Sequence, residues 1–209
     1  MAPLPDPAGL QLTYERQAQT FDAQRGRSPF EAAWLDRFAA HLPPKARVLD
    51  LGCGAGEPIA QWLIAKGYDV TGLDFSTNML AIARARWPEG DWREGDMRDL
   101  DEVAAWDGII GWNSLFHLSA EDQRACLPRL ARALTPTGAL MLSVGHSHGE
   151  VAGTVGDEQV YHASLSPAEY ANLLDANDMQ LRGFIAEDET CNNHTVLLAR
   201  RTPQGDKTS

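Results

Sequence analysis

Cysteine is scarce in this 209-residue chain and forms no recognisable pattern. Cys53, Cys126 and Cys191 stand far apart and include no CxxC pair. A disulfide framework and a zinc-finger site are both disfavoured, and we expect no bound metal. A reducing compartment, the cytoplasm, is the simplest expectation for a chain that uses cysteine so little.

Long apolar runs are absent as well. No stretch reaches the roughly 18 consecutive apolar residues of a membrane-spanning helix. Met1 to Gly9 holds Pro3, Pro5 and Pro7, and it has neither the basic start nor the apolar core of a signal peptide. We expect a frayed N-terminal arm here and no membrane partner.

Positive charge is in short supply. The chain has 18 Lys and Arg against 29 Asp and Glu, a net charge of -11 and a pI near 4.9. Nucleic-acid binding depends on clustered Lys and Arg that neutralise phosphates, so this balance argues against a nucleic-acid partner. The overall charge does not exclude a local basic pocket within an acidic surface.

The rest of the composition is that of an ordinary globular protein, with 44% hydrophobic residues and a length that fits one domain. Strand-like and helix-like segments alternate, which predicts an α/β fold with helices on both faces of a parallel sheet. The expected strands are 47–51, 69–73, 91–94, 106–112 and 138–144, and the expected helices are 58–66, 76–87, 120–133 and 166–176. Two last strands, 181–187 and 194–200, are expected to form an antiparallel hairpin. The prediction is a doubly wound, mostly parallel seven-stranded sheet.

The chain is predicted to divide into three regions. Residues 1–42 form an N-terminal arm and two helices, with Ser28 and Pro29 at the start of the second helix. Residues 43–200 hold the alternating segments, and the polar stretch 201–209 is expected to be a flexible tail. After Gly145 the pattern weakens, and we interpret the segment before the helix at 166 as a polar, glycine-rich loop.

The most informative segment is Val48 to Gly56, in which a strand runs into a glycine turn and then a helix. Glycines let the backbone approach a ligand closely, and a helix N-terminus offers unpaired N–H groups. A dinucleotide fingerprint would have its last glycine where Glu57 stands, which disfavours a nicotinamide-dependent dehydrogenase. Asp50 and Glu57 instead suit a ligand that carries a sulfonium and an ammonium group.

Val48 to Gly56 resembles motif I of the class I S-adenosylmethionine-dependent methyltransferases, and further pieces follow in the order of that family. Asp74 matches the acid after the second strand, which in the family accepts hydrogen bonds from both ribose hydroxyls. Asp96 and Met97 match the pair after the third strand, where the carboxylate binds the adenine amino group and methionine can pack on the ring. Asn113 lies where the fourth strand opens into the reaction centre. The resemblance implies a Rossmann-like fold and S-adenosylmethionine as cofactor, with S-adenosylhomocysteine as product.

The resemblance includes the N-terminal helices, which form a lid in small-molecule members of the family. Tyr14, Phe21 and Arg25 resemble the lid pattern Tyr-x(6)-Tyr/Phe-x(3)-Arg, in which an aromatic residue covers the cofactor; a core-packing stripe is the alternative. The implied cofactor-binding set is Tyr14, Asp50, Gly52, Cys53, Gly54, Asp74, Phe75, Asp96, Met97 and Asn113.

The implied reaction is a direct displacement, in which an acceptor atom attacks the sulfonium methyl group. Alignment supplies much of the acceleration, and a base is needed only when the acceptor must lose a proton. The Asn/Asp-Pro-Pro-Tyr/Phe signature of base and glutamine methylation is absent after the fourth strand, so we expect a small-molecule acceptor. His117 is the candidate general base, and orienting a loop is its alternative role.

Polar residues after the fifth strand and in the final hairpin are candidates for acceptor binding, because ligands of such folds bind at the carboxyl ends of strands. They are His117, His146, Glu150, Tyr161, His162 and His194. His146, His148 and Glu150 match no known zinc spacing, so substrate recognition is favoured over metal binding. His194 has an alternative role as a cap of the hairpin.

The same motifs are compatible with a noncatalytic adenosylmethionine sensor or partner module, because a fold and its cofactor motifs do not establish turnover. An open polar cavity beside His117 would favour the enzyme, and a filled one the sensor. We expect a methyltransferase that acts on a small molecule as a monomer or homodimer.

Overall fold

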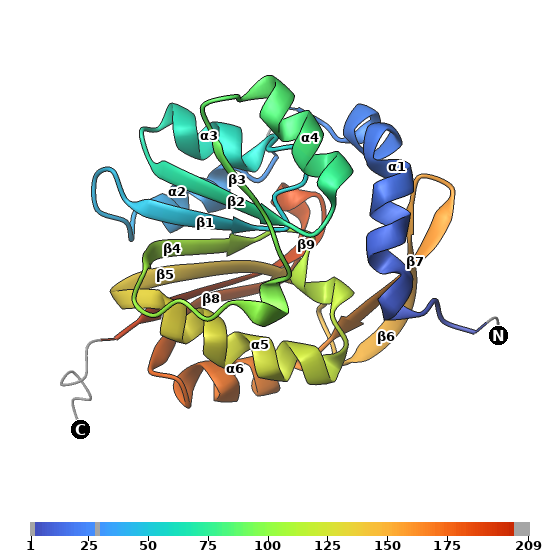
Figure 1. Ribbon diagram of the computed structural model, residues 1–209. Helices are drawn as coiled ribbons and strands as arrows, with labels where there is room; N and C mark the ends of the chain where they lie inside the picture. Colours follow the sequence, from blue (N-terminus) through green and yellow to red (C-terminus); the bar gives the residue numbers. More distant parts are fainter. Residues whose placement is uncertain (1–2, 28–29, 203–209) are drawn as a thin grey trace.

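The computed structural model describes residues 3–27 and 30–202, and a seven-stranded sheet forms its centre (Figure 1). The strands are β1 (Arg47–Leu51), β2 (Asp69–Asp74), β3 (Asp91–Glu94), β4 (Trp106–Gly111), β5 (Leu134–Val144), β8 (Met179–Asp188) and β9 (His194–Arg201), in the order β3-β2-β1-β4-β5-β9-β8. The first five run parallel, whereas β9 is antiparallel to both β5 and β8. The predicted doubly wound sheet with a C-terminal antiparallel hairpin is confirmed.

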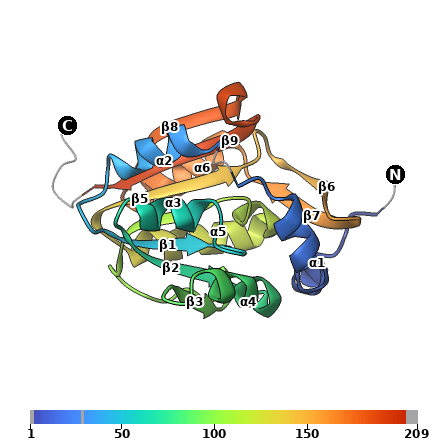
Figure 2. The same cartoon turned by 90° about the horizontal axis from the view of Figure 1, so that it is seen from above.

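Helices cover both faces of this sheet, as strands buried on two sides require. On one face pack α2 (Ala32–Ala39), α3 (Ile59–Ala65) and α4 (Thr77–Arg86), and on the other α5 (Ala120–Ala133) and α6 (Pro167–Asp175) (Figures 1 and 2). Ser76 caps α4 as predicted, because its hydroxyl accepts a hydrogen bond from the Met79 amide at 3.2 Å. A buried apolar core lies on each side of the sheet.

A second, two-stranded sheet lies apart from the first and consists of β6 (Gly149–Val155) and β7 (Glu158–Ser164). The expectation of a glycine-rich loop between β5 and α6 is therefore wrong. Glycines interrupt the period-2 pattern that would have revealed the strands. The connection Gly156-Asp157 nevertheless has the composition of a two-residue hairpin turn, and Gly156 has a φ of 59°.

Helix α1 (Leu10–Gln24) runs beside this hairpin, past the carboxyl ends of the parallel strands (Figures 1 and 2). Its Glu15 carboxylate accepts a hydrogen bond from the Thr77 N–H at 2.6 Å, at the start of α4. Toward the hairpin, Arg16 Nε donates to Glu158 Oε1 at 3.1 Å. The helix thus joins the helical layer of the main sheet to the hairpin.

Short 3-10 helices complete the described chain: η1 (Pro7–Gly9), η2 (Met97–Asp99), η3 (Leu115–His117) and η4 (Glu189–Cys191). The predicted helix start at Ser28 and Pro29, and residues 203–209 of the predicted tail, lie outside the described residues. Arg201, the first residue of that predicted tail, belongs to β9.

Candidate functional site

The turn after β1 depends on glycine, with positive φ at Gly52, Gly54 and Gly56. Gly52 and Gly54 have φ values of 70° and 53°, a region that residues with a side chain rarely adopt. A Cβ atom at Gly52 would also lie 2.5 Å from the Ser114 Cβ, so two loops meet there too closely for any side chain. The Gly54 N–H donates to the Asp74 carboxylate at 2.9 Å, which fixes the turn to the end of β2.

Two buried carboxyl groups, Asp50 and Asp74, lie at the ends of β1 and β2. Asp74 accepts a second hydrogen bond from the Ser76 N–H at 2.8 Å. Burial raises the pKa of Asp50 to about 7, with the Asp74 charge adding to the effect, and burial raises the pKa of Asp74 to about 6. Because the ionised forms are disfavoured while they stand alone, a positively charged ligand is favoured beside them.

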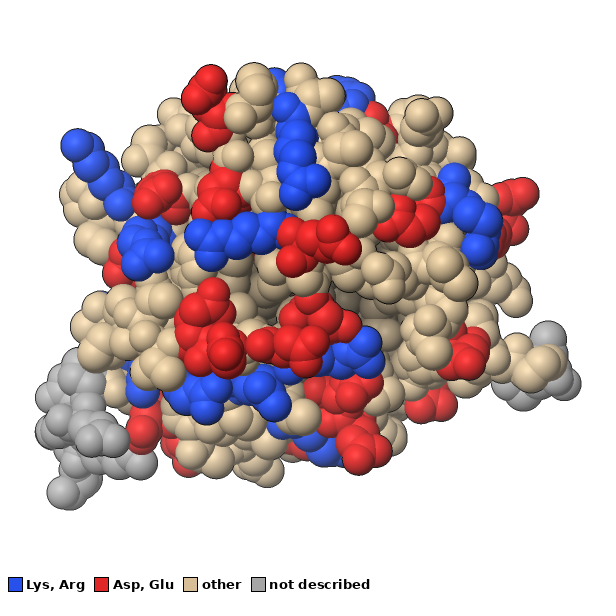
Figure 3. Space-filling view, in the orientation of Figure 1, with Lys and Arg blue, Asp and Glu red and all other residues tan. Residues whose placement is uncertain are grey.

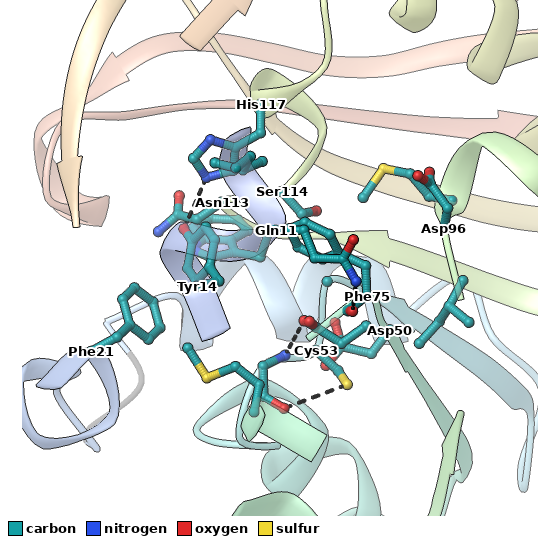
Figure 4. A pocket seen from close by; sticks show the side chains of 18 of the residues that line it. Gln11, Tyr14, Phe21, Asp50, Cys53, Phe75, Asp96, Asn113, Ser114 and His117 are labelled. Atoms are coloured by element: carbon teal, nitrogen blue, oxygen red, sulfur yellow. Dashed lines mark hydrogen bonds between the residues drawn. The ribbon is translucent and has the colours of Figure 1, made fainter. Parts of the chain in front are cut away.

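The turn and the two acids open onto a cleft of about 170 Å³ (Figure 4). All ten residues of the predicted cofactor set line it: Tyr14, Asp50, Gly52, Cys53, Gly54, Asp74, Phe75, Asp96, Met97 and Asn113. Trp112 and Ser114 line it as well, and the Trp112 indole N–H and the Ser114 hydroxyl are buried without a hydrogen-bond partner in the described part of the chain. Unpaired buried polar groups are costly, so both groups destabilise the ligand-free chain.

A second cavity, of about 370 Å³, shares the residues Tyr14, Phe21, Asn113 and His117 with the cleft. Its other walls come from η3, the end of β5, the β6–β7 hairpin and the turn between β8 and β9. Four imidazoles line it, those of His117, His146, His162 and His194, so we call it the histidine chamber. Among the described residues that line it, Glu187 supplies a carboxylate, and none is Lys or Arg.

His117 lies in the shared wall, and both of its ring nitrogens are engaged, one of them by Tyr14 as Figure 4 shows. Nδ1 lies 3.1 Å from the Tyr161 carbonyl oxygen, which can only accept, so Nδ1 carries the proton. The Tyr14 hydroxyl then donates to Nε2 at 2.9 Å. Burial, together with the neighbouring His162, lowers the pKa of His117 to about 3, and burial raises that of Tyr14. A neutral His117 therefore holds the Tyr14 hydroxyl and the β7 backbone at Tyr161 in place.

Asn113, also in the shared wall, has a φ of 53°, which is uncommon outside glycine. Its backbone N–H donates to Ser143 Oγ at 2.7 Å, and its side-chain Oδ1 lies 3.1 Å from His194 Nε2. The His194 ring stacks on Trp112 with 5.3 Å between ring centroids, and its Nδ1 lies 3.1 Å from the Cys191 carbonyl. His194 therefore both caps the turn before β9 and faces the chamber.

The six predicted acceptor-binding residues divide between two environments. His117, His146, His162 and His194 line the histidine chamber, whereas Glu150 and Tyr161 line neither cavity. Side chains alternate between the faces of a strand, so Tyr161 and His162 point to opposite sides of β7. The Tyr161 hydroxyl instead donates to Glu150 Oε1 at 2.6 Å on the other face of the hairpin.

Several chamber residues were not among the predicted candidates, and Phe116, Asn192 and Asn193 are examples. Phe116 precedes His117 and packs on His162 with 4.5 Å between ring centroids. Asn192 and Asn193 both have positive φ, 52° and 56°, in the turn before β9. Two consecutive asparagines before a strand are a turn signal, but no sequence pattern brings that turn to the end of β4.

No group of three or more His, Cys, Asp or Glu side chains within residues 3–27 and 30–202 is arranged to hold a metal ion. In the same residues, no helix combines the length and the apolar character needed to cross a bilayer. Lys and Arg alternate with Asp and Glu across the face of the molecule in Figure 3, without a continuous basic patch on that face.

Residues 48–138 match the model of a family described as Methyltransferase domain. Over 147 residues the chain is 32% identical to YqeM of Bacillus subtilis (strain 168), whose name assigns it to the methyltransferases; the match covers 68% of this chain and 58% of that protein. Over 183 residues it is 29% identical to the ubiquinone biosynthesis O-methyltransferase of Xanthomonas oryzae pv. oryzae, covering 77% of this chain and 75% of the relative. The chain thus spans little more than half the length of the Bacillus relative.

Among solved structures, the 1,6-didemethyltoxoflavin-N1-methyltransferase of Burkholderia thailandensis has the same fold, with a TM-score of 0.72 and 24% sequence identity. The similarity covers 97% of this chain and 93% of that one. That structure contains 1,6-didemethyltoxoflavin and S-adenosylhomocysteine.

Proposed function

We propose that this chain is a class I S-adenosylmethionine-dependent methyltransferase that transfers a methyl group to a small-molecule acceptor by direct displacement. One observation carries the proposal: the cleft and the histidine chamber meet at Tyr14, Asn113 and His117. A cofactor in the cleft and an acceptor in the chamber would bring their reacting atoms together at this wall, and holding them there supplies much of the acceleration.

The residues of the cleft fit S-adenosylmethionine. Asp74 would accept hydrogen bonds from the ribose hydroxyls, Asp96 would bind the adenine amino group, and Met97 would pack on the ring. The positive-φ glycines of the turn would let the backbone approach the amino-acid end of the molecule closely. Bound S-adenosylmethionine supplies a methyl group that is already activated by the sulfonium charge.

The walls of the chamber support a small acceptor without phosphate groups. Its described lining residues include no Lys or Arg, and the pKa of His117 is lowered to about 3, so that imidazole is uncharged at neutral pH. Imidazole nitrogens and the amides of Asn192 and Asn193 offer hydrogen bonds, while Phe116 offers an aromatic face. The structure of the Burkholderia neighbour also contains an organic small molecule together with S-adenosylhomocysteine.

The first test is calorimetric titration with S-adenosylmethionine and S-adenosylhomocysteine, with Asp74→Ala in parallel. We expect the wild-type chain to bind both, and the substitution to weaken binding by about 10- to 100-fold, because hydrogen bonds to a carboxylate are lost. A wild-type chain that binds neither compound would refute the proposal.

The second candidate, a noncatalytic sensor, would bind the cofactor in the same titration. It differs in that no acceptor would release S-adenosylhomocysteine. The open chamber next to the cleft favours the enzyme, because a sensor has no need for room beside the methyl group.

We also propose that the protein acts in the cytoplasm, as a monomer or homodimer. The three cysteines are buried free thiols, which suits a reducing compartment. Sedimentation of the purified chain distinguishes the two oligomeric states.

A further inference from the structure

We propose that His162 is the general base of the histidine chamber, the group that removes a proton from the acceptor atom as that atom is methylated. The inference rests on the proposed methyl transfer and adds a catalytic residue to it. It follows from the hydrogen bonds of the four imidazoles that line the chamber.

Three of these imidazoles are unsuited to the task. His117 uses Nε2 for the Tyr14 hydroxyl, at 2.9 Å, and Nδ1 for a backbone carbonyl, at 3.1 Å. His194 has an oxygen acceptor at each ring nitrogen, Asn113 Oδ1 and the Cys191 carbonyl, each at 3.1 Å, so its one N–H is used and its other nitrogen faces a protein oxygen rather than an acceptor molecule. His146 lies at the exposed rim, with Nδ1 3.8 Å from Glu187 Oε1.

His162 is different, because neither of its ring nitrogens has a hydrogen-bond partner in the part of the chain that the structure describes. The ring is half-buried, and its centroid lies 4.5 Å from that of Phe116 and 4.8 Å from that of His117. It therefore stands next to the shared wall with a free lone pair. Burial lowers its pKa, which keeps the imidazole neutral at physiological pH.

The hairpin leaves room for this ring at one residue, Gly153. A Cβ atom there would lie 2.1 Å from His162 Cε1 and 2.6 Å from Nε2. The imidazole thus lies directly over the β6 backbone, and a side chain at position 153 would displace it. Packing against Gly153 and Phe116, rather than a hydrogen bond, holds the ring in place.

The proposed step balances with the groups named. The acceptor heteroatom forms a bond to the methyl carbon while the carbon–sulfur bond breaks, and the bonding pair stays on sulfur to give neutral S-adenosylhomocysteine. The proton of the acceptor N–H or O–H moves to a free nitrogen of His162, and the imidazolium later releases it to solvent. The other titratable groups of the chamber are Tyr14 on α1, His117 on η3, His146 after β5, Glu187 on β8 and His194 on β9.

The kinetic test uses transfer of a radiolabelled methyl group from S-adenosylmethionine to a fixed panel of small phenols and N–H azoles. We expect His162→Gln to lower kcat by about 100-fold or more for every acceptor that the wild-type chain methylates, with unchanged cofactor affinity. The pH profile should lose its limb on the acid side. Gly153→Ala should also lower kcat, whereas His41→Gln, at a position that lines neither cavity, should leave kcat unchanged.

The second test needs no acceptor. In nitrogen-15 NMR of the histidine rings, with S-adenosylhomocysteine bound, His162 should titrate below its usual pKa, while His117 stays fixed as the Nδ1–H tautomer. A His162 ring locked in one tautomer, or a His162→Gln variant with wild-type kcat and pH profile, overturns the proposal. Failure to bind S-adenosylhomocysteine would refute the proposed function itself, and cofactor binding without methylation of any panel member would refute the assigned acceptor chemistry.

Discussion

The cleft and the histidine chamber share a wall, yet their linings differ in charge and in what holds the side chains. In the cleft, buried Asp50 and Asp74 lie against a glycine turn, and backbone N–H groups fix the Asp74 carboxylate. In the chamber, ring packing and imidazole hydrogen bonds hold the side chains, and His117 and His162 have lowered pKa values. The difference suits a cation on one side of the wall and an uncharged molecule on the other.

The comparison also concerns how each cavity is built. The cleft lies at the ends of neighbouring parallel strands, so the sheet sets its shape. The chamber is assembled from α1, the β6–β7 hairpin and the β8–β9 turn, and side-chain hydrogen bonds join α1 to the hairpin and to α4. We therefore expect substitutions in the cleft to abolish cofactor binding. Substitutions in the chamber should change turnover, and substitutions in α1 should change the rate at which the cofactor dissociates.

The largest effect is expected from Gly52→Ala. The new methyl group would meet the Ser114 Cβ at 2.5 Å, and the residue would have to keep a φ of 70°. We expect a loss of about 2–4 kcal/mol in the free energy of unfolding and cofactor binding too weak for calorimetry. Gly54→Ala is the matched control, because no atom lies within 4 Å of its Cβ and only the positive φ of 53° is penalised, by about 1–2 kcal/mol. Equal losses in the two variants would contradict the account.

The next effect concerns Tyr14 and His117 in the shared wall. Tyr14→Phe removes the hydroxyl that donates to His117 Nε2, and His117→Gln removes its acceptor. Each should lower kcat about tenfold, the equivalent of roughly one hydrogen bond, with little change in cofactor affinity. Because the two residues act as a unit, the double variant should be no worse than either single one. Additive losses would show that the pair is not coupled.

The acids of the cleft predict that cofactor affinity depends on pH. Asp50 and Asp74, with pKa values of about 7 and about 6, are protonated in mild acid and ionised above pH 7. A cationic ligand binds the ionised form better, so affinity for S-adenosylmethionine should fall as the pH drops from 8 to 5, by at most about tenfold per pH unit for each proton taken up. S-adenosylhomocysteine lacks the sulfonium charge and should show a smaller fall. If the affinities for both ligands fell equally with pH, the ionisation of Asp50 and Asp74 could not explain the preference for a cationic ligand.

The same groups set the pH dependence of stability in the ligand-free chain. Their folded pKa values lie above the ordinary value of 3.8, so the folded state binds more protons than the unfolded state between that value and about pH 7. This contribution to stability is present below pH 3.8 and is lost as the pH rises through 6 and 7. Asp50→Asn should flatten that part of the profile in chemical denaturation.

The smallest effect is expected in α1. Glu15→Gln removes the charge that caps the start of α4 at the Thr77 N–H, a contact worth up to about 1 kcal/mol. Cofactor dissociation in stopped-flow experiments should speed up by roughly two- to fivefold. Glu121→Gln, in the first turn of α5, is the control. If it accelerated cofactor dissociation to a similar degree, the effect would not be specific to the contact between α1 and α4.

Much of the cleft could be predicted because its residues follow consecutive strands. Once the parallel order was inferred, Asp50, Asp74 and Asp96 had to meet at one edge of the sheet. The chamber could not be predicted to the same extent. Its hairpin was misread because glycines broke the strand pattern, and Gly153, one of those glycines, is the residue that makes room for His162. Without that hairpin, nothing in the sequence separates Tyr161 from His162, although the alternation of β7 sends their side chains to opposite faces.

The most direct test of the account is calorimetric titration of S-adenosylmethionine into the wild-type chain, Gly52→Ala and His162→Gln. If the two cavities have separate tasks, the wild-type chain should bind one S-adenosylmethionine per chain. This binding should be lost in Gly52→Ala and unchanged in His162→Gln. An absence of binding to the wild-type chain, or an equal loss of affinity in both variants, would contradict the division between a cofactor cleft and an acceptor chamber.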